Sequence, residues 1–116
     1  MLTATVPLDH AHIDAQHLHD RIVEAASADQ PQLSTGIENA GFRAGALAAG
    51  LRKALRTHGS TARTHLNSAI AFLDAAAADA ADAAYSTGND VHDHISRMIA
   101  ATRSAVVELG LARSSG

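Results

Sequence analysis

Cysteine, tryptophan and bulky aromatic residues are the main absences in this chain of 116 residues. It has no Cys and no Trp, and two Phe and one Tyr make up an aromatic fraction of only 3%. The lack of Cys excludes disulfides, thiolate zinc sites and cysteine nucleophiles. Because Ala, with scattered Leu, Ile and Val, supplies the apolar side chains, any core must be thin.

Long apolar runs are absent as well. The sequence has no stretch of about 18 apolar residues that could span a bilayer, and no basic segment followed by an apolar one at its N-terminus. We therefore expect no membrane insertion. Export to the cell envelope or the medium would need a leaderless route, and a chain that acts as a partner or chaperone would stay in the cytoplasm.

The alanine-rich composition favours long helices packed side by side, because Ala loses almost no side-chain entropy in a helix and allows close backbone approach. Strand-like alternation of bulky residues occurs only briefly, from Leu2 to Val6. Apolar residues otherwise recur every three or four positions. The prediction is an all-α single domain, 1–116, of alanine-rich amphipathic helices forming an antiparallel helical hairpin or four-helix bundle. The expected helices cover about 8–26, 37–57, 60–85 and 90–110.

Bulky residues on these apolar stripes are expected to form the core or to meet a partner chain. They are Leu8, Leu18, Ile22, Leu47, Leu51, Leu55, Leu66 and Leu73.

Turn-forming residues separate the predicted helices. Residues 27–36 combine Pro, Gly, Asp and Ser, which predicts a loop. Gly59 predicts a break or kink between the second and third helices. Gly88 fits a helix C-terminal cap, and Asn89 or Asp90 fits the N-cap of the fourth helix. The last residues, 110–116, are expected to fray.

Charge is segregated along the chain. Six acids and one Arg precede residue 39, five bases and no acid lie from Arg43 to Arg63, and five acids and no base lie from Asp74 to Asp93. An acidic first helix folded against a basic second one would be electrostatically complementary. Nucleic-acid binding is not expected, because the basic stretch lacks the aromatic and glycine context that single-strand binding uses.

Eight histidines are the strongest chemical anomaly of the sequence. His92 and His94, two positions apart, would point to opposite sides of a helix and could not hold one ion together. At helical spacing, His10, Asp14 and His17 share a face and could bind a divalent metal, with Asp90 and His94 as further ligands. The alternative is a solvated polar face, and no cofactor is expected. Eight imidazoles, with an ordinary pKa of about 6.5, could also make partner binding respond to pH.

Catalytic patterns are weak. Ser60 lies close in sequence to His58, and Ser96 close to His92, but nothing around either pair indicates an oxyanion hole. The glycines of "AGFRAGALAAG" lie inside an apolar helical pattern, where close helix packing explains them better than a phosphate loop does. Asp74, Asp79 and Asp82 are expected to be exposed, so they suggest no acid–base pair. We expect a non-enzymatic protein.

Three stretches carry a resemblance to a known family: "TATVPLDHAHIDAQHLHDRIVEAA", "NAGFRAGALAAGLRKAL" and "AAAADAADAAY". Over most of residues 3–95 the chain resembles small actinobacterial proteins of the EspC-like group, associated with type VII (ESX) secretion and related in architecture to the WXG100 helical hairpins. The resemblance implies a secreted substrate or a helical partner, a homodimer or heterodimer, and a secretion ATPase that reads the export signal.

In that family a Tyr-x-x-x-Asp/Glu export signal follows the hairpin. Tyr85 stands at its tyrosine, Asn89 at its fourth following residue, and Asp90 one place later. Gly41 and Phe42 stand where the family has its Trp-x-Gly turn. The sequence thus leads to two hypotheses, a type VII secretion interaction protein and a His/Asp metal-binding or pH-responsive bundle.

Overall fold

A computed structural model describes residues 6–29, 32–86 and 88–115, with side chains for 8–29, 32–86 and 88–114. Four α-helices and one short 3₁₀ helix, with no strand, make up the regular structure of these residues. The all-α prediction is therefore confirmed. The elements are α1 (Val6–Ala26), α2 (Gln32–Ala54), η2 (Leu55–Thr57), α3 (Ser60–Ala83) and α4 (Asn89–Ser115).

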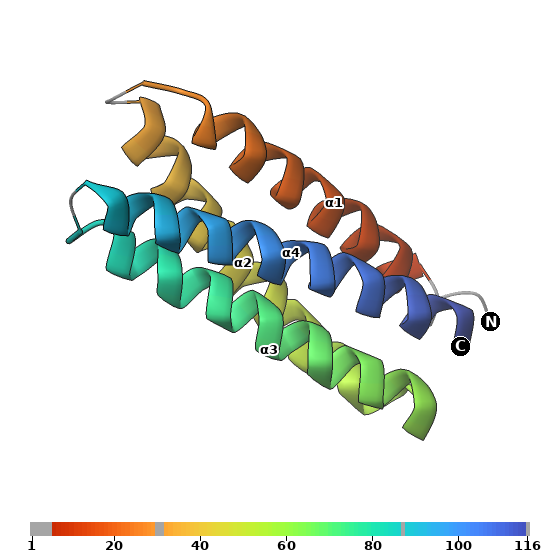
Figure 1. The fold of residues 1–116 in the computed structure, drawn as a ribbon. Coiled ribbons are helices and arrows are strands. Elements are labelled where there is room, and N and C mark those ends of the chain that lie inside the picture. Colours follow the sequence, from red (N-terminus) through yellow and green to blue (C-terminus); the bar gives the residue numbers. More distant parts are fainter. Residues whose placement is uncertain (1–5, 30–31, 87, 116) are drawn as a thin grey trace.

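The helices run alternately up and down in an elongated bundle of 48 × 18 × 18 Å (Figure 1). α1 packs against α2 and α4, and α3 packs against the same two helices. The start of α1 and the end of α4 lie at one end of the bundle (Figure 1). The α1–α2 and α3–α4 connections lie at the other end, so they are brought together although about 60 residues separate them in sequence.

The core consists of the apolar stripes that the spacing predicted. Six of the eight bulky stripe residues are buried, whereas Leu47 and Leu55 are partly buried beside the core. α4 adds a fully buried Thr102, whose hydroxyl donates to the Met98 carbonyl at 2.9 Å. Alanines fill much of the remaining space between helices, and this allows the axes to approach closely. The six buried residues are Leu8, Leu18, Ile22, Leu51, Leu66 and Leu73.

The start of α2 differs from the predicted loop at 27–36. Residues 30 and 31 lie outside the described residues, but the helix already begins at Gln32 and includes Gly36. A Cβ at Gly36 would lie 2.9 Å from the Cβ of Ala25. Gly36 is therefore a contact point between α1 and α2, and the sequence pattern alone could not distinguish this packing role from a turn.

The other helix boundaries also shift. α3 ends at Ala83, so Tyr85 lies in the following turn, where its N–H donates to the Asp82 carbonyl. Gly88 has a φ of 61° and α4 begins at Asn89, so Asn89 and Asp90 lie in the first turn of α4, not at its N-cap. The expected fraying from residue 110 is wrong as far as Ser115, because the buried Ala112 anchors the last turns.

Candidate functional site

A groove of about 600 Å³ lies where α2, α3 and the start of α4 meet. Tyr85 and Phe42 both line it, and they are 93% and 70% exposed. We call this surface the aromatic groove, because two of the three aromatic residues of the chain border it. Its lining comprises Leu33, Ser34, Ile37, Glu38, Gly41, Phe42, Ala77, Ala80, Ala81, Ala83, Ala84, Tyr85, Ser86 and Val91.

Gly41 allows a close contact between α2 and α3 at the aromatic groove. A Cβ on this residue would lie 2.6 Å from the Cβ of Ala80, so α2 and α3 approach each other more closely here than any side chain would allow. Phe42 follows on an exposed position of α2. The resemblance placed Gly41 and Phe42 at the position of the Trp-x-Gly turn, and Tyr85 at the tyrosine of the export signal. In the fold all three residues line one groove.

Asn89 and Asp90, the other residues of the predicted export signal, are exposed in the first turn of α4. They do not line the aromatic groove. Asp90 lies at the helix N-terminus, where a negative charge interacts favourably with the helix dipole. Of the three signal residues, only Tyr85 contributes to the groove surface.

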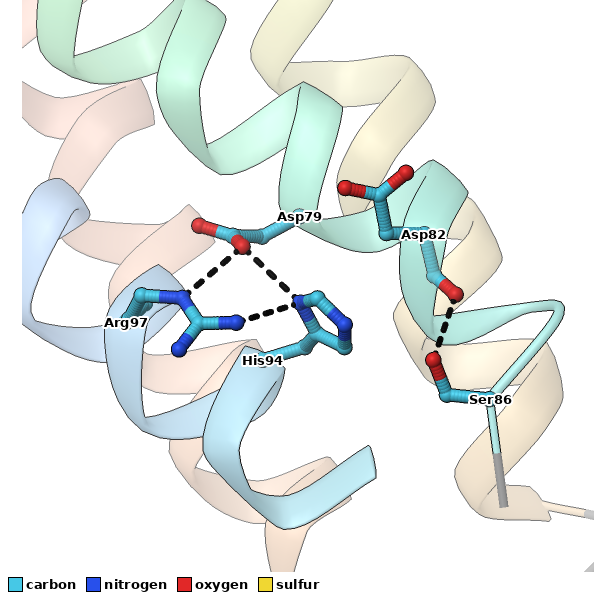
Figure 2. Close-up of polar contacts among 5 residues, drawn as sticks. All are labelled: Asp79, Asp82, Ser86, His94 and Arg97. Carbon is cyan, nitrogen blue, oxygen red and sulfur yellow. Dashed lines mark hydrogen bonds and ion pairs between the residues drawn. The ribbon is translucent and has the colours of Figure 1, made fainter. Parts of the chain in front are cut away.

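A second group of polar side chains joins α3 to α4 (Figure 2). His94 Nδ1 lies 3.0 Å from Asp79 Oδ1, and Arg97 Nε donates to the same oxygen at 3.1 Å. Arg97 Nη2 lies 2.8 Å from His94 Nδ1. The side chains of Asp79 and His94 are only 17% and 16% exposed. The expectation that Asp79 is exposed is therefore wrong, because α4 covers that face of α3.

Asp82, one turn after Asp79, completes a set of possible metal ligands. In the part of the chain that the structure describes, Asp79, Asp82 and His94 are the one group of three His or acidic residues whose ligand atoms all lie within 4.8 Å of one another. We call these three residues the acid–histidine cluster. The sequence did not predict this cluster, because His94 was expected to join Asp90 and the ligands near the N-terminus, and Asp79 and Asp82 were expected to be exposed.

The metal ligands predicted on α1 are not gathered in this way. His10, Asp14 and His17 are exposed along a groove of about 480 Å³ between α1 and α2, which two arginines, Arg21 and Arg43, also line. Spread over two helical turns, the three side chains do not form a group of close ligand atoms. The further ligand expected from α4 is also misplaced, because His94 contacts Asp79 of α3 instead.

The histidines do not all lie on a solvated polar face, since five of the eight are partly buried. His65 Nδ1 lies 2.9 Å from Glu108 Oε1 and so links α3 to α4. His12 Nδ1 lies 2.8 Å from Arg113 Nη1 and so links α1 to α4. The Nε2 atom of His19 is buried without a hydrogen-bond partner among the described residues. The five partly buried histidines are His12, His19, His58, His65 and His94.

Among the described residues, the ion pairs between helices do not join α1 to α2 as expected. Arg52 of α2 pairs with Asp74 of α3. Arg113 of α4 pairs with Asp9 of α1, with Nε 2.6 Å from Oδ1. One basic residue of α2 thus meets one acidic residue of α3. Each of these four side chains is at least 41% exposed, so both pairs contribute little to stability.

Comparison of the chain with protein-family models, curated proteins and solved structures gives no match. The resemblance described above therefore rests on the quoted stretches of sequence. Among the described residues, no helix is both long and apolar enough to cross a membrane.

Proposed function

We propose that this chain is a non-enzymatic helical binding protein of type VII (ESX) secretion, either a substrate or a helical partner of one, and that the aromatic groove is its recognition surface. The observation that carries the proposal is the exposure of Tyr85 and Phe42 along a single groove. Exposed aromatic residues beside an apolar surface are enriched at protein interfaces.

The chemistry of the groove fits an amphipathic helix as the occupant. Its floor is made mainly of Ala, Leu and Ile side chains, which offer room for the apolar residues of a second helix. Ser34, Glu38 and Ser86 add polar groups to the lining. This combination of an apolar floor with polar groups supports binding of a helical protein over binding of a small polar substrate.

Within the proposal, the secretion ATPase reads Tyr85 after the chain has folded. Tyr85 suits this role because its side chain is almost fully exposed and contributes little to the core. An exported chain would reach the envelope or the medium, and a retained one would act in the cytoplasm as the partner or chaperone of a substrate. A heterodimer formed through the groove fits both cases.

Export of Tyr85→Ala tests the proposal in a host that carries the secretion ATPase. We expect the variant to accumulate inside the cells at least about tenfold over wild type while keeping its fold, because truncating an exposed side chain seldom costs more than about 0.5 kcal/mol. Phe72→Ala is the matched control, since Phe72 is a 37% exposed aromatic on α3 outside the groove. Normal export of Tyr85→Ala would refute the role of Tyr85, and equal loss in both variants would point to a general defect.

A further inference from the structure

We propose that the acid–histidine cluster, Asp79, Asp82 and His94, binds a divalent transition-metal ion such as Zn²⁺ and thereby links the end of α3 to the start of α4. The site is distinct from the aromatic groove, because none of the three residues lines that groove. It also lies on other helices than the ligands that the sequence suggested on α1.

The donor atoms match the chemistry of such an ion. An imidazole nitrogen and carboxylate oxygens bind Zn²⁺ at about 2.0–2.2 Å, which places two ligands of a tetrahedral ion about 3.4 Å apart. The ligand atoms of the cluster already lie within 4.8 Å of one another, so ion binding would require each pair to close by at most about 1.4 Å. Three protein ligands leave one position for water, and two carboxylates balance the charge of the ion.

Arg97 already occupies the position of a cation in this cluster (Figure 2). A guanidinium group can only donate hydrogen bonds, so its contact with His94 Nδ1 requires a lone pair on that nitrogen. The same nitrogen lies 3.0 Å from Asp79 Oδ1, which is also an acceptor. If Nδ1 instead carries a proton for Asp79, that proton faces the N–H of Arg97.

One of these two contacts is therefore unfavourable in either tautomer of His94. A metal ion would accept the lone pair of His94 Nδ1 and that of Asp79 Oδ1 at the same time. Arg97 could then turn into solvent, because its side chain is already 56% exposed. Arg97 thus acts as an internal competitor of the metal.

Asp82 supplies the third ligand without losing another interaction. Among the described residues its carboxylate makes no hydrogen bond or ion pair, and the contact from Ser86 goes to its backbone carbonyl (Figure 2). Asp79 and Asp82 are three residues apart on α3, which places them on one face of the helix. The ion would hold that face against the first turns of α4 and stabilise the junction that carries Tyr85.

Calorimetric titration of the full, untagged chain with Zn²⁺ tests the site. We expect one saturable 1:1 binding event, weakened about 100-fold or more in His94→Ala. His92→Ala is the matched control, because His92 is an exposed histidine two residues away on the same helix and outside the cluster. Its affinity should equal that of wild type. No saturable binding below about 100 μM, or equal weakening in both variants, would overturn the proposal.

Two further variants separate metal binding from folding. Asp82→Asn should weaken Zn²⁺ binding at least about tenfold and leave the melting temperature of the metal-free chain unchanged, since the carboxylate has no protein partner. Arg97→Gln should tighten binding about fivefold, because it removes the competing charge. Unchanged affinity in Asp82→Asn, or weaker binding in Arg97→Gln, would contradict the assigned ligands.

Discussion

Gly41 shows how a single missing side chain determines a contact between two helices. An added Cβ would meet the Cβ of Ala80 at 2.6 Å, and that atom belongs to a short side chain that cannot turn away. Gly45, four residues further along α2, has no atom within 4 Å of the corresponding position. The two glycines therefore have the same helical backbone but different surroundings.

Replacing each of them by Ala should have opposite effects. We expect Gly41→Ala to lower the free energy of unfolding by about 1–2 kcal/mol, because separating α2 from α3 costs more than the helix propensity that Ala adds. Gly45→Ala should raise it by about 0.5–1 kcal/mol through propensity alone. Urea unfolding measures both variants. Equal stabilisation by both substitutions would show that α2 and α3 are not in close contact at Gly41.

Single residues also show where the sequence was not sufficient. The sequence drew attention to Tyr85 and Gly41, which both line the aromatic groove, but it treated Asp79 as an exposed acid. Asp79 is covered by α4. Its contact on that helix, His94, lies 15 residues later in the chain. No local spacing rule connects these two residues, so the acid–histidine cluster was not predictable.

At the scale of elements, the two junction glycines Gly59 and Gly88 differ in their backbone. Gly59 precedes α3 with φ −72° and ψ 173°, which any residue can adopt, and it provides no side-chain cap. Gly88 precedes α4 with φ 61°, which disfavours residues that carry a Cβ. A Cβ would meet no atom within 4 Å at either position, so only the backbone distinguishes them.

Substitutions at Gly59 and Gly88 should change the free energy of unfolding in opposite directions. Gly59→Asp should raise the free energy of unfolding by about 1 kcal/mol, because Asp caps the first N–H groups of α3 and restricts the unfolded chain. Gly88→Ala should lower it by about 1–2 kcal/mol, since Ala is strained at a positive φ. Thermal unfolding followed by circular dichroism measures both. Destabilisation by Gly59→Asp would contradict an open, extended residue before α3.

At the scale of the whole molecule, the four helices described bury their apolar stripes against one another. The bulky residues of these stripes were expected either to form the core or to meet a partner chain. Within the described residues each stripe already has neighbours on two other helices, so a partner would add a contact at the aromatic groove without completing the core.

Thermal unfolding at different protein concentrations tests whether the core is complete within one chain. We expect the same melting temperature from about 5 to 500 μM, because a core formed within one chain does not depend on association. A chain that needs a second copy would melt at higher temperature as concentration rises. Scattering or sedimentation at the same concentrations should show no change in particle size.

The sequence by itself determined the helices and their buried faces. Apolar spacing depends only on the geometry of a single helix, so it identified Leu18, Leu66 and Leu73 as core residues. It also located the breaks near Gly59 and Gly88, because these depend on local backbone preferences.

Only the tertiary structure decided which helices are neighbours and which side chains they bring together. Arg52 of α2 pairs with Asp74 of α3, the glycines at 36 and 41 act as contact points, and His94 meets Asp79. These contacts depend on the relative rotation and displacement of whole helices, which the packing of all four core stripes determines together. The aromatic groove and the acid–histidine cluster are products of that arrangement.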